Sequence, residues 1–335
     1  MPLVETVNSF REKVPAAEYD GMKFEIRDGE ASLAGCRDLR HAYIPESVDG
    51  FPVTGIDTGA FYGCLPLEHV IIPDSVSSIG DFAFFGCRFL ESVRIPDSVT
   101  SIGAGAFAGC GIETINIPRS VAYVGGGAFA GCGRLQYIYV RGSNPDYISR
   151  NGSLYDTRPG NMLVAFPAAK YRIYSVPEGT SGILDRVFYG CGTLEAAEIP
   201  DSVTEIGEYA FCGCSSLKSL KIPNNISEIR KGTFKRCESL ESVYIPDSVC
   251  RIDAQAFEGC RSLKTVRIPP RVRELEYNAF FGCGSLRSAE FSGPVYYIDK
   301  HAFRGCCSLR TVRMPDVSGH TDKSVFPEGC DIIRV

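Results

Sequence analysis

Apolar residues recur along this chain with a period of 23 residues. The segment 87–109, CRFLESVRIPDSVTSIGAGAFAG, shows the unit, which generalises to C-x-x-L-x-x-V-x-I-P-x-S-V-x-x-I-G-x-x-A-F-x-G. Cysteine marks the first position at Cys36, Cys64, Cys87, Cys110, Cys132, Cys191, Cys214, Cys237, Cys260, Cys283 and Cys306, and phenylalanine recurs near the end at Phe61, Phe84, Phe107, Phe129, Phe188, Phe211, Phe234, Phe257, Phe280, Phe303 and Phe326. A fixed period of this length indicates one small structural unit copied many times, each copy burying its apolar side against its neighbours.

The residues of one unit predict a strand, a turn and a return segment. Val93 and Ile95 alternate with polar residues, so both point to one side of a short strand. Pro96 ends the strand, because proline has no amide hydrogen to donate to a neighbouring strand. The apolar residues that follow, up to Phe107, face inward again through a turn and a brief helical segment, and Gly103 is expected to permit the bend.

Stacking of these units predicts an α/β repeat solenoid. It has about 11 to 12 repeats of 23 residues and forms a right-handed superhelix. A curved parallel β-sheet is expected on the concave side, and turns and short helical segments on the convex side. The phenylalanines are expected to stack into a spine, and one continuous core is expected to run through the whole array.

The pattern divides the chain into four segments. They are an N-terminal segment with a capping hairpin (1–35), a first block of repeats (36–140), an inserted β-hairpin (141–170), and a second block of repeats with a C-terminal capping strand (171–335). Caps are needed because open sheet edges are templates for aggregation. KFEIRDGEASLAG (23–35) accordingly predicts two strands around an Asp28–Gly29 turn, and CDIIRV (330–335) predicts a closing strand.

The period breaks once, between Cys132 and Cys191. These two cysteines are 59 residues apart instead of 23, so 36 residues are additional. In the inserted segment, SLYD and MLVAF flank the turn-rich sequence TRPGN and predict a hairpin. Two interpretations stay open. The hairpin packs on the sheet, or it contributes to a ligand-binding surface, where insertions in repeat arrays often lie.

The template resembles the Treponema pallidum type of leucine-rich repeat, which occurs in BspA-like proteins. The likeness runs from about residue 24 to about residue 330. It includes IPESVDGFPVTGI (44–56), similar to the family's first repeat, and NGSLYDTRPGNMLVAFP (151–167), similar to its inserted hairpin. The resemblance implies a leucine-rich-repeat solenoid in a secreted or surface-attached protein associated with adhesion and protein binding. The first residues, MPLVETVNSFREKVPAAE, show no apolar run of an export signal, so the localisation stays open between the cell surface and the cytoplasm.

Charge and hydropathy disfavour several classes of partner. The net charge is −5 and charged residues make up 22% of the chain, so no basic field for nucleic acid is expected. No apolar stretch approaches the roughly 18 residues that span a bilayer, so no membrane insertion is expected. The chain has four histidines, and no serine or cysteine is paired with a base in a recognisable arrangement. No catalytic residue and no cofactor are therefore expected.

The 15 cysteines are expected to be reduced thiols and not disulfides, with those at the periodic position in the core. Equivalent positions in a parallel stack point their side chains the same way, and a thiol can donate weakly to the backbone of an adjacent turn. Four cysteines lie outside the periodic position, at Cys212, Cys250, Cys307 and Cys330. No spacing here matches the two C-x-x-C pairs of a structural zinc site, so no metal is expected.

The outward-facing residues beside Val93 and its equivalents form the candidate binding surface. Its members are His41, Tyr43, His69, Ile71, Arg94, Tyr137, Tyr139, Tyr244, Arg267 and Arg313. The N-terminal half is rich in aromatic residues, and tyrosine and arginine are preferred anchors in protein interfaces. Packing under the inserted hairpin is the alternative for these aromatic residues. In the C-terminal half, Arg267 and Arg313 flank Glu290 in an expected ladder of opposite charges.

These observations favour a non-enzymatic binding module. We expect it to recognise a protein ligand, such as a host or cell-surface protein, through the concave face of the solenoid, as an adhesin does. A monomer is expected. The first alternative is an intracellular protein-interaction scaffold, favoured by the reduced cysteines. A further alternative is a hydrolase-type enzyme that depends on His41 or His69.

Overall fold

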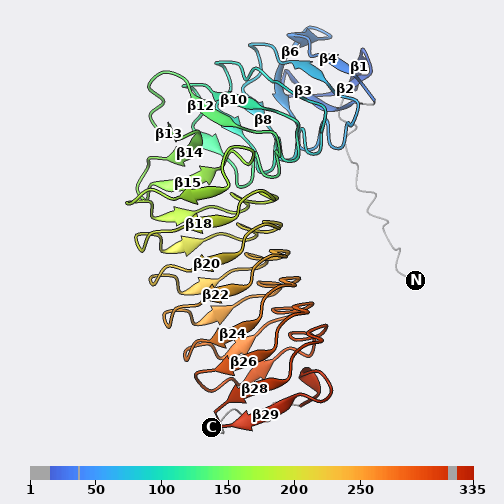
Figure 1. Ribbon diagram of the computed structural model, residues 1–335. Helices are drawn as coiled ribbons and strands as arrows, with labels where there is room; N and C mark the ends of the chain where they lie inside the picture. The colour runs from blue at the N-terminus through green and yellow to red at the C-terminus, as the bar shows by residue number, and fades with distance from the viewer. Residues whose placement is uncertain (1–15, 37, 316–322) are drawn as a thin grey trace, which may run out of the picture.

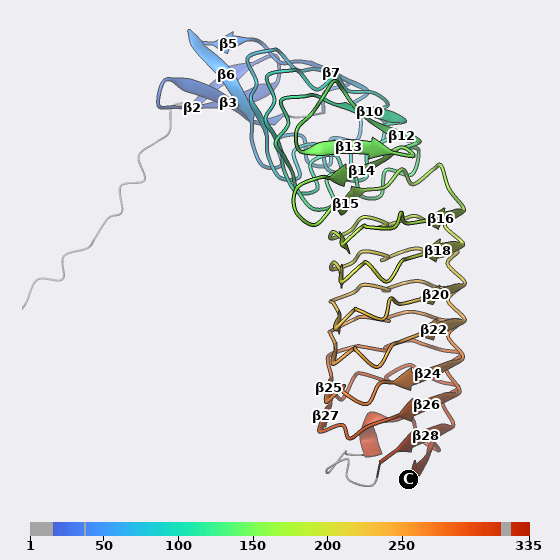
Figure 2. The same cartoon turned by 90° about the vertical axis from the view of Figure 1, so that its left-hand side faces the viewer.

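The chain forms a parallel β-solenoid, described here by a computed structural model that covers residues 16–36, 38–315 and 323–335 (Figure 1). A typical turn of the solenoid contributes one strand to a first row and a two-residue strand to a second row. Figure 2 shows these rows on opposite sides of the C-terminal half. The predicted solenoid of parallel strands is confirmed.

The two rows differ in strand length. The first strand row consists of β4 (His41–Tyr43), β7 (His69–Ile71), β10 (Thr114–Ile117), β12 (Tyr137–Val140), β16 (Ile173–Ser175), β18 (Ala196–Glu198), β20 (Ser219–Lys221), β22 (Ser242–Tyr244), β24 (Thr265–Ile268), β26 (Ser288–Phe291), β28 (Thr311–Met314) and β29 (Asp331–Arg334). The second strand row consists of β6 (Phe51–Ile56), β8 (Ser78–Ile79), β9 (Ser101–Ile102), β11 (Tyr123–Val124), β17 (Gly182–Ile183), β19 (Glu205–Ile206), β21 (Glu228–Ile229), β23 (Arg251–Ile252), β25 (Glu274–Leu275) and β27 (Tyr297–Ile298).

The first strand row is not the single sheet that the sequence predicts. Its hydrogen-bonded groups are β4-β7, β10-β12, β16-β18-β20-β22 and β24-β26-β28-β29. The row is therefore interrupted on both sides of residues 92–94, at the inserted segment, and between β22 and β24.

The predicted helical segments near the phenylalanines are wrong. These segments are turns, and the only helix within the described residues is the short 3-10 helix η1 (Lys323–Val325). Their amides donate across repeats: Phe84 N to Ala106 O at 2.7 Å, and Phe107 N to Ala128 O at 2.8 Å. Since these amides bond to a neighbouring repeat, they do not close the i to i−4 bonds of an α-helix.

A left-handed residue within each of several turns also prevents a helix. Phe82 has φ +55° and Gly105 has φ +61° at equivalent positions. The ring of Phe82 covers Gly105, where an added Cβ would lie 2.7 Å from the ring. Gly103 serves a different need from the expected bend. A Cβ there would lie 2.5 Å from the Asp81 amide nitrogen, so glycine permits close approach of two backbones.

Phenylalanine and cysteine form two parallel columns inside the solenoid. The rings of Phe61, Phe84, Phe107 and Phe129 stack in the first block, and those of Phe188 to Phe303 stack in the second. Cysteine thiols donate to phenylalanine carbonyls 25 or 26 residues earlier in the chain, as Cys110 Sγ does to Phe84 O at 3.0 Å. The predicted spine is thus confirmed in two parts, and so is the predicted thiol-to-backbone contact.

Both ends of the solenoid carry additional strands. The strands β1 (Ala16–Tyr19), β2 (Met22–Arg27) and β3 (Glu30–Cys36) form an antiparallel cap, and β3 pairs in parallel with β6. The short strand β5 (Ser47–Val48) pairs with β6. At the other end, β29 pairs with β28. The hairpin around Asp28–Gly29 and the closing strand are therefore confirmed, whereas the sequence did not predict β1.

The inserted segment forms three strands that lie between two separate cores. They are β13 (Tyr147–Arg150), β14 (Ser153–Asp156) and β15 (Met162–Ala165). Leu154 packs in the N-terminal core, and its neighbour Tyr155 packs in the C-terminal core. Because successive side chains of a strand point to opposite faces, the inserted sheet separates the two cores. The predicted hairpin of β14 and β15 is confirmed. In place of the expected single continuous core, the buried residues form two clusters, and the partly buried Leu184 packs against both.

The inserted strands also explain an elbow in the molecule. On the turn side, Gly131 N donates directly to Tyr189 O at 3.0 Å, so the repeats before and after the insertion touch. On the strand side, β13 to β15 separate these repeats. The insertion is thus a wedge, and Figure 1 shows the elbow with β12 and β13 on its outer side. The candidate surface beside the insertion consequently does not line the inside of this bend.

Buried thiols should make the fold sensitive to alkaline pH. Burial raises the pKa of the Cys132 thiol from its ordinary value of 9.0 to about 12, and burial also raises that of Cys260. The folded state therefore disfavours the thiolate. We expect full stability below about pH 9 and a loss of stability as the pH rises toward about 12. The measurement is the urea midpoint as a function of pH, with reductant present; a midpoint that stays constant above pH 9 would contradict it.

Candidate functional site

The N-terminal end of the candidate surface is formed by β4 and β7. Their register places His41 beside His69 and Tyr43 beside Ile71. The imidazole rings stack with centroids 5.2 Å apart and planes inclined by 6°. Tyr43 and Ile71 are 57% and 56% exposed. The middle residues of the two strands, Ala42 and Val70, point inward instead. Four predicted residues thus form one contiguous, partly apolar surface.

Two tyrosines form a second group on β12. Tyr137 and Tyr139 point to the same side of the strand, and their rings stack with centroids 5.6 Å apart. The Lys170 ammonium lies 3.9 Å from the centre of the Tyr137 ring, which is a cation–π geometry. The edge of β12 is also covered, because Ile138 N donates to Gly152 O at 2.9 Å.

The sequence left two interpretations of these tyrosines, a binding surface or packing under the inserted hairpin, and each applies to a different residue. Tyr137 packs against the inserted segment, as its contact with Lys170 shows, and it is 36% exposed. Tyr139 is 46% exposed. Tyr139 therefore offers the larger fraction of its side chain to a partner.

The remaining predicted residues are dispersed. Arg94 pairs with Asp74 at 3.1 Å, and Arg267 pairs with Asp247 at 2.7 Å. Tyr244 is 52% exposed on β22. Arg313 faces Glu290 in the strand register.

The expected ladder from Arg267 through Glu290 to Arg313 has the predicted strand register. The Arg267 guanidinium nevertheless pairs with an aspartate of the turn that follows β22. Both side chains of this pair are exposed, so the pair contributes little to stability. The C-terminal residues lie beyond the inserted segment and do not join the aromatic groups of the N-terminal block.

Sequence reasoning missed an aromatic cluster on the turns. Tyr62 stacks on Phe85 with ring centroids 4.9 Å apart, and Phe82 meets Phe85 edge-on at 5.9 Å. Tyr62 is 62% exposed and Phe82 41% exposed. The sequence did contain a signal for this cluster. Phe82 occupies a repeat position that is glycine in the neighbouring repeats, at Gly59 and Gly105.

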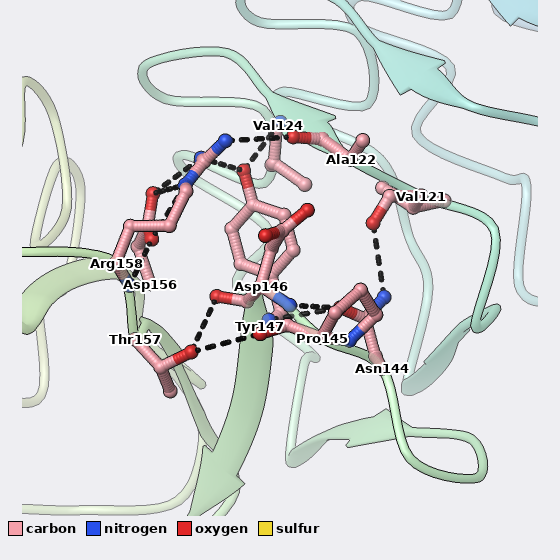
Figure 3. Close-up of polar contacts among 10 residues, drawn as sticks. All are labelled: Val121, Ala122, Val124, Asn144, Pro145, Asp146, Tyr147, Asp156, Thr157 and Arg158. Atoms are coloured by element: carbon pink, nitrogen blue, oxygen red, sulfur yellow. Dashed lines mark hydrogen bonds and ion pairs between the residues drawn. The ribbon is translucent and has the colours of Figure 1, made fainter.

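Polar contacts fix the inserted segment to the last repeat of the N-terminal block (Figure 3). Val124 N donates to Tyr147 Oη at 2.9 Å, and Arg158 donates to Ala122 O at 3.1 Å. These groups bind one backbone atom of β11, Val124 N, and one of the residue just before it, Ala122 O, in place of a following repeat. Partial burial opposes ionisation of Asp156, but its hydrogen bonds with Arg158 hold the pKa of Asp156 below its ordinary value.

Asn144 forms the second fixed point of this junction. Its side-chain amide donates to Pro118 O and Val121 O, at 2.9 Å each. Its side-chain oxygen accepts hydrogen bonds from Asp146 N and Tyr147 N. One buried side chain thus connects the chain entering β13 to the preceding repeat.

No metal-binding cluster of three or more His, Cys, Asp or Glu side chains occurs in residues 16–36, 38–315 and 323–335. Within the same part of the chain, no helix is long and apolar enough to cross a membrane. The clearest chemical feature of the surface is its exposed aromatic residues, which suit contact with another molecule.

The periodic template that builds these strand rows matches a known family model. The model describes the BspA type leucine rich repeat region in six copies and matches residues 54–152, 181–310 and 227–335. The chain belongs to the BspA-type leucine-rich repeat family. A comparison with curated proteins gave no significant sequence match.

Several solved structures share this fold. A leucine-rich cell surface protein from Faecalibacterium prausnitzii is 22% identical, with a TM-score of 0.58 over 89% of this chain and 94% of that one. The pneumococcal vaccine antigen PcpA is 18% identical, with a TM-score of 0.64 over 95% and 93%. A leucine-rich repeat protein from Eubacterium ventriosum is 21% identical, with a TM-score of 0.60 over 86% and 93%. At these identities the likeness concerns the fold alone.

Proposed function

We propose that this protein is a non-enzymatic recognition module that binds a protein ligand through the first strand row of its N-terminal block. The observation that carries the proposal is the outward-facing aromatic surface on β4, β7 and β12. Tyr43 and Tyr139 are 57% and 46% exposed there. Exposed aromatic residues on ordered strands suit a protein interface, because large rings bury much area while losing little side-chain freedom.

Adhesion at a cell surface is the specific role that we propose. It is supported by the family and by the description of the Faecalibacterium prausnitzii relative as a cell surface protein. The ligand in this proposal is a host or cell-surface protein, and the protein acts as a monomer. Repeat families of this kind are typically binding modules, which favours recognition over the hydrolase alternative.

The test is alanine replacement of the tyrosines. The variant Tyr43→Ala/Tyr137→Ala/Tyr139→Ala should weaken capture of the protein ligand at least about tenfold, since aromatic anchors are commonly worth 2 kcal/mol or more. The readout is quantitative affinity capture with the purified chain, followed by titration of the recovered ligand.

A matched control removes three exposed tyrosines from other surfaces. Tyr123, Tyr277 and Tyr296 are 54%, 52% and 66% exposed, and their replacement by alanine should leave capture unchanged. Thermal unfolding of both variants checks the fold. If the first variant captures the ligand as well as the unaltered chain, the surface is placed wrongly.

An intracellular scaffold is the second candidate, and the thiol contacts favour it. Cys87 and Cys214 each donate a thiol hydrogen to a backbone carbonyl, and a disulfide would remove these donors. Reduced thiols persist in reducing compartments. Fractionation of the native cells decides between the two roles: recovery at the surface supports adhesion, and recovery in the cytoplasm supports the scaffold.

A further inference from the structure

Two arginines next to the β12 tyrosines border a hollow in the surface. The hollow has a volume of about 560 Å³ and is lined by Asp97, Arg119, Ser120, Arg141, Gly142 and Pro145. In the strand register, Ile117 faces Val140, so Arg141 follows directly on β12 and lies beside the segment that carries Arg119. The hollow thus adjoins the tyrosine surface.

The charges around this hollow are incompletely neutralised. Arg94, Arg134 and Arg158 in the same region form ion pairs with carboxylates. Within the part of the chain that the structure describes, neither Arg119 nor Arg141 has such a partner. Asp97 is the only acidic residue among those that line the hollow.

The wall of the hollow is held in place by the insertion. Asn144, next to Pro145, makes the four hydrogen bonds described above, two of them to carbonyls of the repeat that carries Arg119. The backbone at Pro145, which lines the hollow, is therefore held against the repeat that carries Arg119, and Figure 3 shows Asn144 and Pro145 at this junction. A fixed backbone limits the ordering cost of binding.

Strand alternation connects the arginines to the tyrosines. Tyr137 and Tyr139 occupy alternate positions of β12, and Arg141 follows with the same spacing just beyond the end of the strand. The amide of Arg141 still donates to Ile117 O at 2.9 Å, so the extended pairing continues to Arg141 and places it on the same side as the two tyrosines. Arg119 lies one repeat away, beside Arg141. The surface therefore offers two stacked rings followed by two guanidinium groups.

We propose that this Tyr-Arg surface, made of Tyr137, Tyr139, Arg119 and Arg141, binds an acidic segment of the protein ligand. Two carboxylates of an extended segment pair with the guanidinium groups, and an adjacent apolar or aromatic side chain contacts the tyrosines. Arginine binds carboxylates through two parallel hydrogen bonds, and complementary charge both steers and selects a partner. This inference rests on the proposed function, because it names the chemistry of the ligand at the same face.

The test uses a fluorescently labelled random copolymer of glutamate and tyrosine, with binding followed by anisotropy at low salt. The variant Arg119→Glu/Arg141→Glu should weaken binding at least about tenfold, because both favourable charge contacts become repulsive. The control Arg271→Glu/Arg287→Glu makes the same change in net charge at two exposed positions of the C-terminal block. It should stay within about twofold of the unaltered chain.

Each outcome decides the proposal. If both variants lose copolymer binding equally, the effect is one of overall charge and the inference is overturned. It is also overturned if the unaltered chain does not bind the copolymer, or if neither variant loses binding. Heparin is the second probe: loss of heparin binding with unchanged copolymer binding would assign the arginines to an acidic polysaccharide instead. If the arginine variant keeps ligand capture while the tyrosine variant loses it, the acidic segment is excluded and the proposed function stands.

Discussion

Replacement of Phe211 by alanine is expected to lower the free energy of unfolding by about 3–5 kcal/mol. The Phe211 ring is fully buried and stacks on Phe188 and Phe234, with centroids 4.6 Å and 5.6 Å away. Its removal leaves a cavity in the middle of the column, and repeats on both sides keep their own rings in place, so collapse cannot fill it. Urea unfolding monitored by circular dichroism measures the change.

The matched control for Phe211 is Phe89→Ala. Phe89 is 60% exposed, so its replacement should change the free energy of unfolding by less than about 0.5 kcal/mol. Equal effects at the two positions would show that the phenylalanine column does not hold the repeats together.

Two neighbouring residues of β14 should destabilise different halves of the molecule. Leu154→Ala is expected to cost about 2–5 kcal/mol in the N-terminal core, and Tyr155→Ala about 3–5 kcal/mol in the C-terminal core. Tyr155 also loses its hydroxyl contact with Tyr174, at 2.7 Å. The physical reason is the alternation of side chains across the inserted sheet, which places these two residues in separate hydrophobic clusters.

Hydrogen exchange followed by mass spectrometry locates the loss. Leu154→Ala should raise exchange mainly in β6 to β11, and Tyr155→Ala mainly in β17 to β21, because opening of one core need not open the other. If each substitution raises exchange equally in both blocks, the inserted sheet does not separate two cooperative units.

Much of the fold could be predicted from the sequence, because it repeats. The template identified most of the first-row strands and the phenylalanine column, and the break in the template indicated the hairpin of SLYD and MLVAF. The strand predicted at Val93 and Ile95 is wrong, because the described residues between Ile79 and Ser101 contain no strand. The division of the buried residues into two cores could not be predicted. Leu154 and Tyr155 are both apolar, and two adjacent apolar residues do not reveal that each faces a different core. The second row has strands of two residues, such as Ser101–Ile102, which are too short to give an alternating pattern. The turns were taken for helices because the left-handed φ of Gly105 depends on bonds to neighbouring repeats.

The candidate site was predictable where it depends on strand alternation alone. Alternation correctly indicated that Tyr43, Ile71 and Tyr139 are exposed. Whether the surface is continuous was not predictable, because that depends on which strands pair across the inserted segment. The partner of Arg267 was also hidden, since Asp247 and Glu290 both lie within reach of its long side chain.

The large side chains in the left-handed turn position restrict the order in which repeats can follow one another. Tyr209 covers Gly232 much as Phe82 covers Gly105: a Cβ on Gly232 would lie 2.3 Å from the Tyr209 ring. A tandem copy of the repeat with Tyr209 would place a second tyrosine where glycine is required. We therefore expect genetic lengthening of this array by one repeat to be tolerated at some junctions and not at others. At the Phe82–Gly105 and Tyr209–Gly232 junctions, we expect the aromatic repeat and the glycine repeat after it to be gained or lost together.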